Sequence, residues 1–364
     1  MLERLNQAME HIEWRGDPAA RDAAIRRFKR RELLRIACRD LAGGAAAEDI
    51  GREITYLAEA ALRAALVSLE EELPAPGTAR FAVIGMGKLG GEELNYASDI
   101  DVMFVFDAAD ERTGYAWAAQ MGEGILARLA ATTEEGQAFR VDASLRPEGK
   151  DGPLVRSLAA YRTYYERWAQ PWEFQALIKA RPVAGDPTLG AEFMDLVRPS
   201  VYPEAVSAET LREIRSMKAR IEKERLGPRE DRRFQLKVGT GGLVDVEFTT
   251  QLLQIQHAYK DPRLQAQGTI LAIAAAADMA LLDLEQARWL VDAFRFLNHT
   301  RNVLYLIRGR PQDALPQEAD EVEVLARALG YAAPGARVQF LEDYRRITRR
   351  CRRVCETVFY GGDQ

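Results

Sequence analysis

Two aspartates separated by a single residue, Asp99 and Asp101, have the types and spacing most suited to chemistry. Alternate side chains of a strand project from the same face, so both carboxylates would face one way and the apolar residues around them the other. Mg²⁺ prefers such oxygen ligands and usually keeps waters and substrate phosphates as well. The pattern predicts a metal site, with a solvated strand end as the alternative interpretation.

A third acid, Asp142, stands in a second apolar stretch, FRVDASLRP, and Arg146 follows it. If the two stretches form neighbouring strands, Asp142 completes a triad of carboxylates that could hold one or two Mg²⁺ ions. Asp99, Asp101 and Asp142 are therefore the predicted catalytic and metal-binding residues. Arg146 is predicted to neutralise phosphate charge, and a surface arginine at a strand end is the alternative.

A glycine-rich turn, GMGKLGG at 85–91, connects an apolar strand to the aspartates. Glycines permit a tight backbone whose N–H groups can face a phosphate at the start of a short helix. The spacing excludes a Walker P-loop, and acids follow too soon for a dinucleotide-binding turn. The predicted nucleotide-binding residues are Gly85, Gly87, Lys88, Gly90, Gly91, Arg146, Lys179 and Arg181.

Two of these basic residues, Lys179 and Arg181, are expected in one helix that also holds Trp172 and Glu173 and that Pro182 ends. Either side chain could contact a phosphate. Taken alone, the two would describe an exposed helix end, which is the alternative.

The composition is that of a globular protein and argues against several classes of function. The 364 residues are 47% hydrophobic and 29% charged, a size for two or three domains. A net charge of −5 does not suit a protein that binds nucleic acid over its whole surface. The three histidines and three cysteines show no spacing for zinc, serine-triad or cysteine-protease chemistry. No apolar stretch reaches the ~20 residues of a membrane span and no signal sequence is apparent, so a cytoplasmic protein is expected.

The apolar periodicity divides the chain into an N-terminal helical segment at 1–73, an α/β part at 74–200 and a helical bundle at 201–364. Helices are expected over 17–34, 47–69 and 115–129, and strands over 81–85, 100–106 and 139–141. In the last part Ser207 is a candidate N-cap. Further helices are expected over 243–257, 267–280, 284–307, 321–329 and 338–358.

With these residues placed, the chain resembles the glutamine synthetase adenylyltransferase family of the DNA polymerase β-like nucleotidyltransferases. The resemblance covers nearly the whole chain and depends on four motifs in order: GMGKLGGEELNYASDID at 85–101, VDASLRPEG at 141–149, WEFQALIKAR at 172–181 and KVGTGGLVDVEF at 237–248. It implies an α+β fold, in which a small mixed sheet with helices forms a nucleotidyltransferase core at 74–200 between the two helical parts. It also implies that Asp99, Asp101 and Asp142 hold the metals, and that Gly90, Gly91 and the nearby Ser98 belong to the nucleotide-binding site.

The same resemblance implies a reaction. The family has two homologous halves, one adding AMP from ATP to a tyrosine of glutamine synthetase and one removing it by phosphorolysis, and this sequence holds one copy. Segments at 164–173, 220–226, 253–258, 308–316 and 358–362 are more similar to the adding half, whereas Ser144 stands where the family often has arginine. The implied activity is therefore Mg²⁺-dependent adenylylation of glutamine synthetase, with the PII signalling protein as a further partner and neither membrane nor nucleic acid expected. Phosphorolysis, uridylyl or RNA-directed nucleotidyl transfer, and a non-catalytic regulatory module are the alternatives.

Two features stand apart from this prediction. Asp245 and Glu247 are two residues apart, so on a helix they diverge by about 200° and cannot face one ion. We expect one to contact substrate and the other to cap the helix, or Asp245 to be only an N-terminal helix acid. Two arginine-rich runs, at 26–31 and 345–353, could dock an acidic partner or RNA, with solvated helix faces as the alternative.

Overall fold

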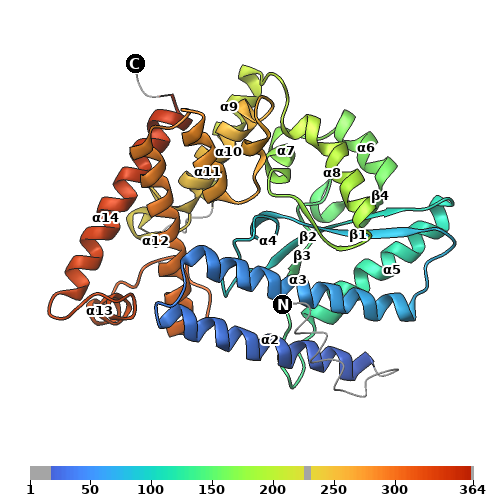
Figure 1. Cartoon of the computed structure of the whole chain (residues 1–364), viewed down its shortest axis with the longest axis horizontal. Helices are drawn as coiled ribbons and strands as arrows, with labels where there is room; N and C mark the ends of the chain where they lie inside the picture. Colours follow the sequence, from blue (N-terminus) through green and yellow to red (C-terminus); the bar gives the residue numbers. More distant parts are fainter. Residues whose placement is uncertain (1–17, 225–230, 362–364) are drawn as a thin grey trace. The chain divides into compact units, whose positions relative to one another are not determined.

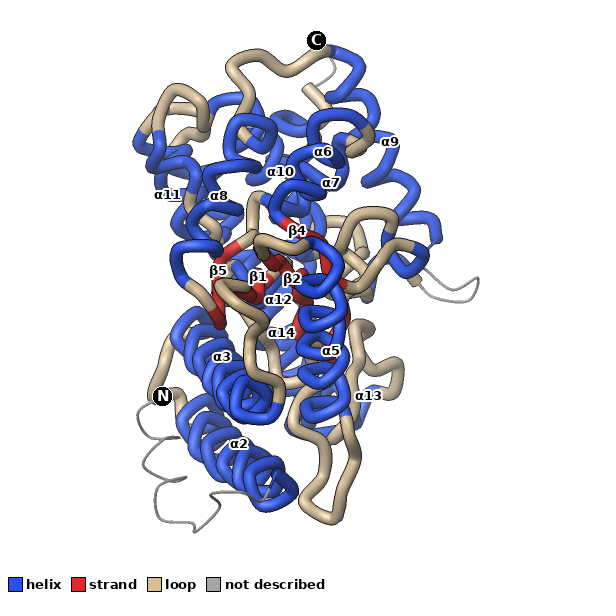
Figure 2. Tube along the Cα trace, turned by 90° about the vertical axis from the view of Figure 1, so that its right-hand side faces the viewer, coloured by secondary structure: helices blue, strands red, loops and turns tan. Residues whose placement is uncertain are grey.

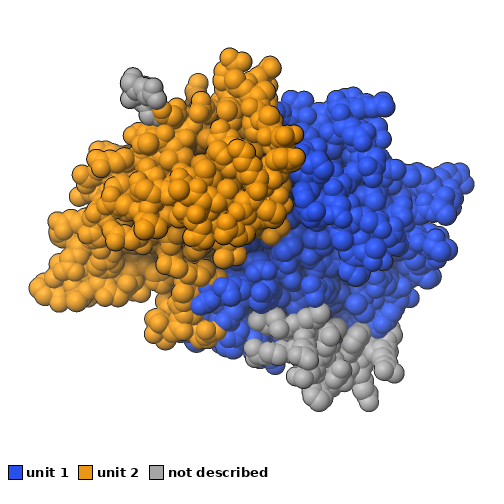
Figure 3. All heavy atoms as spheres, turned by 45° about the horizontal axis from the view of Figure 1, so that its top comes forward, with its two compact units in different colours: residues 1–38, 49–94, 98–201 blue, residues 39–48, 95–97, 202–364 orange. Residues whose placement is uncertain are grey.

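The computed structural model describes residues 18–224 and 231–361, which form an α+β protein as predicted. The chain divides into two compact units, coloured separately in Figure 3. The first comprises residues 1–38, 49–94 and 98–201, and the second comprises residues 39–48, 95–97 and 202–364. The three-part division of the sequence at residues 73 and 200 stays a prediction.

The first unit contains a small mixed sheet, which confirms that part of the prediction. Its strands are β1 (Arg80–Gly85), β2 (Ile100–Asp107), β3 (Val141–Asp142), β4 (Val155–Ser157) and β5 (Arg181–Gly185). The order is β3-β2-β1-β5, and β4 also pairs with β2. β1 runs antiparallel to β2 and β5, whereas β3 and β4 run parallel to β2.

Helices lie on both sides of this sheet (Figure 1). The helices of this unit are α2 (Pro18–Leu41), α3 (Ala47–Glu72), the one-turn α4 (Gly87–Gly90), α5 (Glu111–Ala130), α6 (Leu158–Arg167), α7 (Pro171–Leu177) and α8 (Pro187–Val201), with a 3₁₀ turn η1 (Gly149–Asp151). The run Val102–Phe106 of β2 is buried without interruption, because helices cover both faces of the central strand. The predicted helices over 17–34, 47–69 and 115–129 are confirmed within the described residues.

Two expectations for this unit were wrong in detail. The strand expected at 139–141 begins only at Val141. The helix expected to carry Lys179 and Arg181 ends at Leu177, and Arg181 and Pro182 begin β5 instead. Pro182 is tolerated because β5 is an edge strand whose register with β1 shifts between Val83 and Ile84.

The second unit is the predicted helical bundle (Figure 2). Its elements are α9 (Ala208–Glu224), η2 (Arg232–Phe234), α10 (Leu243–His257), η3 (Pro262–Gln265), α11 (Thr269–Asp278), α12 (Leu284–Arg308), α13 (Ala319–Ala328), α14 (Ala336–Val354) and the π-helical turn η4 (Cys355–Phe359). Ser207 caps α9 as expected, since its hydroxyl accepts the Thr210 N–H at 3.0 Å. Within the two described ranges, no helix combines the length and apolar character of a membrane span.

Candidate active site

The glycine turn and the second aspartate meet where β1 and β2 pair. The Met86 N–H donates to the Asp101 carbonyl at 2.8 Å, which continues the antiparallel pairing into the turn. Gly87 has a φ of +51°, and a Cβ built on it would lie 2.7 Å from Asp101 Oδ2. Any larger residue would therefore displace the carboxylate, so the glycine at this position keeps Asp101 close to the turn.

Asp142 is the register neighbour of Asp101 in the parallel pair of β2 and β3. Neighbouring strands lie about 4.8 Å apart, so the two acids stand side by side at one end of the sheet. Asp142 Oδ1 accepts the Ser144 N–H at 2.7 Å, which fixes the loop after the strand. Both acidic residues are half-buried. The adjacent strands predicted from sequence are thus present.

Asp99 lies just before β2 and has a basic partner that the sequence did not suggest. Arg140 Nε donates to Asp99 Oδ1 at 2.5 Å, and the Arg140 carbonyl accepts the Ile100 N–H at 2.9 Å. Only the register of β2 with β3 indicates this partner, because pairing Ile100 with Val141 places Arg140 beside Asp99. Both side chains of this ion pair are exposed, at 45% for the aspartate and 55% for the arginine.

Gly90 and Gly91 close the turn upon itself. Their N–H groups donate to the carbonyls of Met86 and Gly87 at 3.1 and 3.0 Å, so these two donors are engaged inside the turn and do not face outward. A Cβ on Gly90 would lie 1.7 Å from the Lys179 carbonyl, so this glycine is needed for packing. A part for both glycines in nucleotide binding stays a prediction.

Lys179 and Arg181 tie the turn to the rest of the first unit. Lys179 Nζ donates to Glu93 Oε2 at 2.6 Å; the lysine side chain is buried and that of the glutamate is 10% exposed. Arg181 pairs with Glu59 and donates to the carbonyls of Leu89 and Gly90 at 3.2 and 3.1 Å. These contacts hold the turn in place, and direct phosphate binding by either residue stays a prediction.

Arg146 spans its own loop. Its guanidinium donates to four backbone carbonyls, those of Ala143 at 2.7 Å, Lys150 at 3.1 Å, Gly152 at 3.0 Å and Pro153 at 3.1 Å. Carbonyls that would otherwise lack donors are thereby satisfied in the turn after β3. Its predicted phosphate contact would require it to leave some of these partners.

The remaining predicted nucleotide contacts surround the turn. Gly85 is buried at the end of β1, where a Cβ would come within 2.7 Å of a Val183 methyl group. Lys88 lies in α4 and Ser98 precedes Asp99, and both are half-buried.

The carboxylate oxygens of Asp99, Asp101 and Asp142 are the kind of ligand that Mg²⁺ prefers. In the described ranges, however, no group of three or more acids, histidines or cysteines is arranged to hold a metal ion. Mg²⁺ is usually held by one or two carboxylates together with substrate phosphates. Asp101 and Asp142, as register neighbours, fit that pattern. Asp99 would join them only on leaving Arg140.

The segment Asn95–Ala97, shortly before these acids, belongs to the second unit. The Asn95 side chain donates to Asn302 Oδ1 at 2.8 Å and accepts from Arg301 at 3.0 Å. The Tyr96 hydroxyl donates to Asp40 at 3.0 Å. Polar contacts within that unit therefore hold the Asn95 and Tyr96 part of the first motif.

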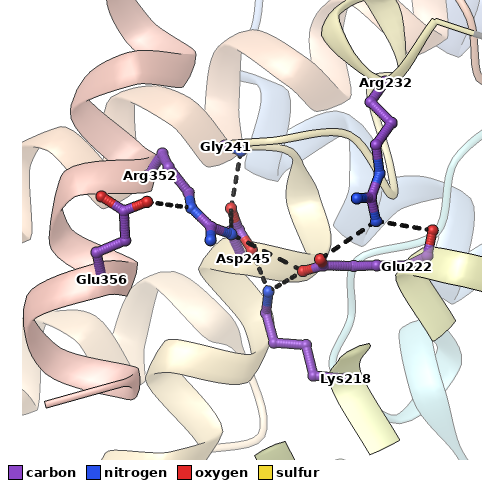
Figure 4. Close-up of polar contacts among 7 residues, drawn as sticks. All are labelled: Lys218, Glu222, Arg232, Gly241, Asp245, Arg352 and Glu356. Carbon is purple, nitrogen blue, oxygen red and sulfur yellow. Dashed lines mark hydrogen bonds and ion pairs between the residues drawn. The ribbon is translucent and has the colours of Figure 1, made fainter. Parts of the chain in front are cut away.

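The fourth motif forms a second glycine and aspartate arrangement, in the helical unit (Figure 4). Asp245 is 1% exposed, accepts the Gly241 N–H at 2.7 Å and pairs with the buried Lys218 and with Arg352. Burial alone would lower the pKa of Lys218, but the Asp245 carboxylate raises it above its ordinary value. The structure thus favours Asp245 as a structural acid of the helix N-terminus; Glu247, two residues on, is half-buried.

The outer members of this cluster complete the charge balance. Glu222 binds Lys218 and accepts from Arg232, and Glu356 accepts from Arg352 at 2.8 Å. The buried carboxylate and its cations are therefore satisfied by one another, as a buried charge requires.

A mixed sheet with paired carboxylates beside a glycine turn is the arrangement expected of a nucleotidyltransferase core. Residues 1–196 match the model of the family described as glutamate-ammonia ligase adenylyltransferase, and the chain belongs to this family. Residues 215–359 match the model described as GlnD PII-uridylyltransferase, which gives the helical unit a likeness of its own.

Three curated relatives carry the name bifunctional glutamine synthetase adenylyltransferase/adenylyl-removing enzyme. That of Mycobacterium avium (strain 104) is 42% identical over 355 residues. Those of Mycobacterium tuberculosis (strain CDC 1551 / Oshkosh) and Nocardia farcinica (strain IFM 10152) are 43% and 42% identical over 352 and 351 residues. Each match covers 94% of this chain and 35% of the relative, so the chain spans about a third of their length.

Proposed function

We propose that this chain transfers AMP from ATP to a tyrosine of glutamine synthetase, with Mg²⁺ bound at Asp101, Asp142 and, once it leaves Arg140, Asp99. The observation that carries the proposal is the pairing of Asp101 with Asp142 in register beside Gly87. The family match and the names of the relatives support the nucleotide and the protein substrate. A cytoplasmic location and a PII-type regulator belong to the same proposal, the latter supported by the likeness of residues 215–359.

In the proposed reaction the tyrosine oxygen attacks the α-phosphorus of ATP. A bond from that oxygen to phosphorus forms, the bond to the β-phosphate oxygen breaks, and pyrophosphate leaves. Bound Mg²⁺ would supply charge neutralisation at the phosphates. Positioning and electrostatics dominate such a transfer, which suits a site built from a fixed turn and fixed carboxylates.

The phenol must lose its proton, since its reference pKa of about 10 keeps it neutral at pH 7. We assign the proton to Asp142. Its Oδ1 already accepts the Ser144 N–H, while Oδ2 makes no hydrogen bond to another described residue. Asp142 Oδ2 can therefore accept the proton, while the hydrogen bond to Oδ1 holds the carboxylate in place.

The test is incubation of the full chain with glutamine synthetase, ATP and Mg²⁺, followed by intact mass measurement of glutamine synthetase. The proposal predicts a gain of one AMP on a tyrosine for each modified subunit. An unchanged mass, with ATP bound and the chain folded, would refute it.

The reverse reaction is the second candidate, because the name of each relative includes an adenylyl-removing activity. Adenylylated glutamine synthetase supplied with phosphate would then release ADP. The match to GlnD PII-uridylyltransferase raises a third possibility, which is transfer of UMP from UTP. A competition experiment tests it, because UTP would compete with ATP only if the chain used UTP.

A further inference from the structure

One face of α14 carries three arginines with no partner in the described chain. Arg345, Arg349 and Arg353 are all exposed and follow one another at intervals of four residues. None of the three guanidinium groups makes an ion pair, hydrogen bond or ring contact with another residue of the described ranges. On a helix, three such positions lie within about 80° of each other and rise by about 6 Å per step, so they form one stripe.

The other arginines of the run at 345–353 are engaged. Arg346 pairs with Asp343 at 2.6 Å, Arg350 lies 5.4 Å over the Trp289 ring, and Arg352 contacts Asp245 and Glu356. The stripe therefore consists of those arginines of the run at 345–353 whose guanidinium groups have no partner in the described residues.

The other basic run, on α2, serves as an internal contrast. Arg26 is 1% exposed and donates to the carbonyls of Arg128 and Ala131, at the C-terminal end of α5. Arg27 and Arg30 both pair with Glu135. These charges of α2 are paired with residues of their own unit. The structure therefore does not support the docking role considered for that run.

We propose that Arg345, Arg349 and Arg353 form a docking surface for an acidic helix of a protein partner. Carboxylates at every fourth position of such a helix repeat at the same interval of about 6 Å and could meet the three guanidiniums in turn. The inference is independent of the reaction proposed above. It extends the function to a contact that lies outside the carboxylate site.

A protein partner is favoured over single-stranded nucleic acid by the surroundings of the stripe. Single strands bind on exposed aromatic platforms beside the basic residues. Along α14, the turn η4 that continues it and the described residues after η4, the exposed large hydrophobic side chains are Val338 and Tyr360. The Tyr360 ring already lies against Lys218 and Arg352. The net charge of −5 also disfavours a polyanion that would contact a wide surface.

The test is fluorescence anisotropy with the full chain and a labelled helical peptide that carries Glu at positions i, i+4 and i+8. We expect the R349E/R353E variant to bind at least about tenfold more weakly than the wild type at low salt, with the difference shrinking as salt screens the charges. The matched control is R27E/R30E, which changes the net charge equally on α2. The neutral R349Q/R353Q variant, checked by thermal unfolding, separates loss of charge from loss of fold.

The outcomes are distinct. A loss confined to the α14 variants supports the surface. Equal losses in the α2 control, no loss, or no binding by the wild type would overturn it. Tighter binding of a single-stranded RNA oligonucleotide, abolished by the same α14 variants, would overturn the protein partner in favour of nucleic acid.

Discussion

The molecule contains two arrangements of a glycine turn and an aspartate, and they differ in what faces the carboxylate. In the first unit Gly87 lies against Asp101, whose neighbour across the sheet is another acid. In the second, Gly241 donates to Asp245, which is buried against Lys218 and Arg352. Both glycines have a positive φ, at +51° and +74°. An acid beside an acid is suited to a cation from outside, whereas an acid among cations is already balanced and serves the fold.

The largest effect is expected from Asp101→Asn, which keeps the shape of the side chain and removes its charge. AMP transfer should fall by at least about 10²-fold, because a group aimed at the reacting phosphates is lost. The free energy of unfolding should change by less than about 1 kcal/mol, as for a residue outside the core. Transfer kinetics and denaturant unfolding of the same preparation measure both, and wild-type kinetics in this variant would remove the metal assignment.

The opposite result is expected from Lys218→Met. Removing the buried cation leaves the buried Asp245 carboxylate with only the more distant Arg352 as a charged partner, and breaking such a buried pair typically costs about 3 to 5 kcal/mol. The folded fraction should keep the wild-type rate of AMP transfer. The matched control is Lys223→Met on the same helix, where the side chain is exposed and unfolding should barely change. Loss of transfer in stable Lys218→Met protein would show that this cluster takes part in the chemistry.

The reactivity of the cysteine thiols tests whether the cluster around Asp245 is a packed, structural part of the fold, and it needs no activity assay. Burial raises the pKa of Cys355 to about 12 and that of Cys351 well above its usual range, whereas Cys38 is exposed. A raised pKa keeps a thiol neutral and unreactive at pH 8. One thiol should therefore react with Ellman's reagent in the native protein and three after unfolding. Rapid reaction of all three in the native wild type would contradict the packing around Asp245, and faster reaction is expected in Lys218→Met.

The smallest effect concerns the ion pair that holds Asp99. Arg140→Ala should lower the Mg²⁺ concentration for half-maximal transfer by a few-fold, since Asp99 no longer has to leave a partner before it binds metal. Arg112→Ala, an exposed arginine of α5, is the control. If transfer is instead lost at every Mg²⁺ concentration, the prediction is contradicted. Arg140 would then act on the substrate, and Asp99 would depend on Arg140 for its function.

Local signals in the sequence predicted where most residues of the proposed site lie. The apolar run of β2, the glycines before it and the acids at its start are close in sequence, and the family motifs agreed with them. The sequence did not indicate Arg140, because its partner depends on the register of β2 with a two-residue strand about 40 residues away. The strand at Arg181 was missed because Pro182 reads as the end of a helix until an edge position with a shifted register is available.

Long-range contacts account for the remaining differences. The cations around Asp245 come from positions 27 and 107 residues away, so the spacing of the motif alone left a substrate contact open. The two basic runs looked alike in composition, and only the fold shows that Glu135 and the end of α5 occupy one of them. Several helices were predictable, since α10 begins and ends at the residues that its periodicity indicates, whereas α6 and α8 were not predicted.

The central claim is that the chemistry takes place at Asp101 and Asp142 and that the cluster at Asp245 is structural. The most direct test is the rate at which glutamine synthetase gains AMP, measured by intact mass with equal concentrations of folded wild-type, Asp101→Asn and Lys218→Met protein. We predict equal rates for the wild type and Lys218→Met and at least about a 10²-fold lower rate for Asp101→Asn. A wild-type rate in Asp101→Asn, or its loss in folded Lys218→Met alone, would contradict the claim.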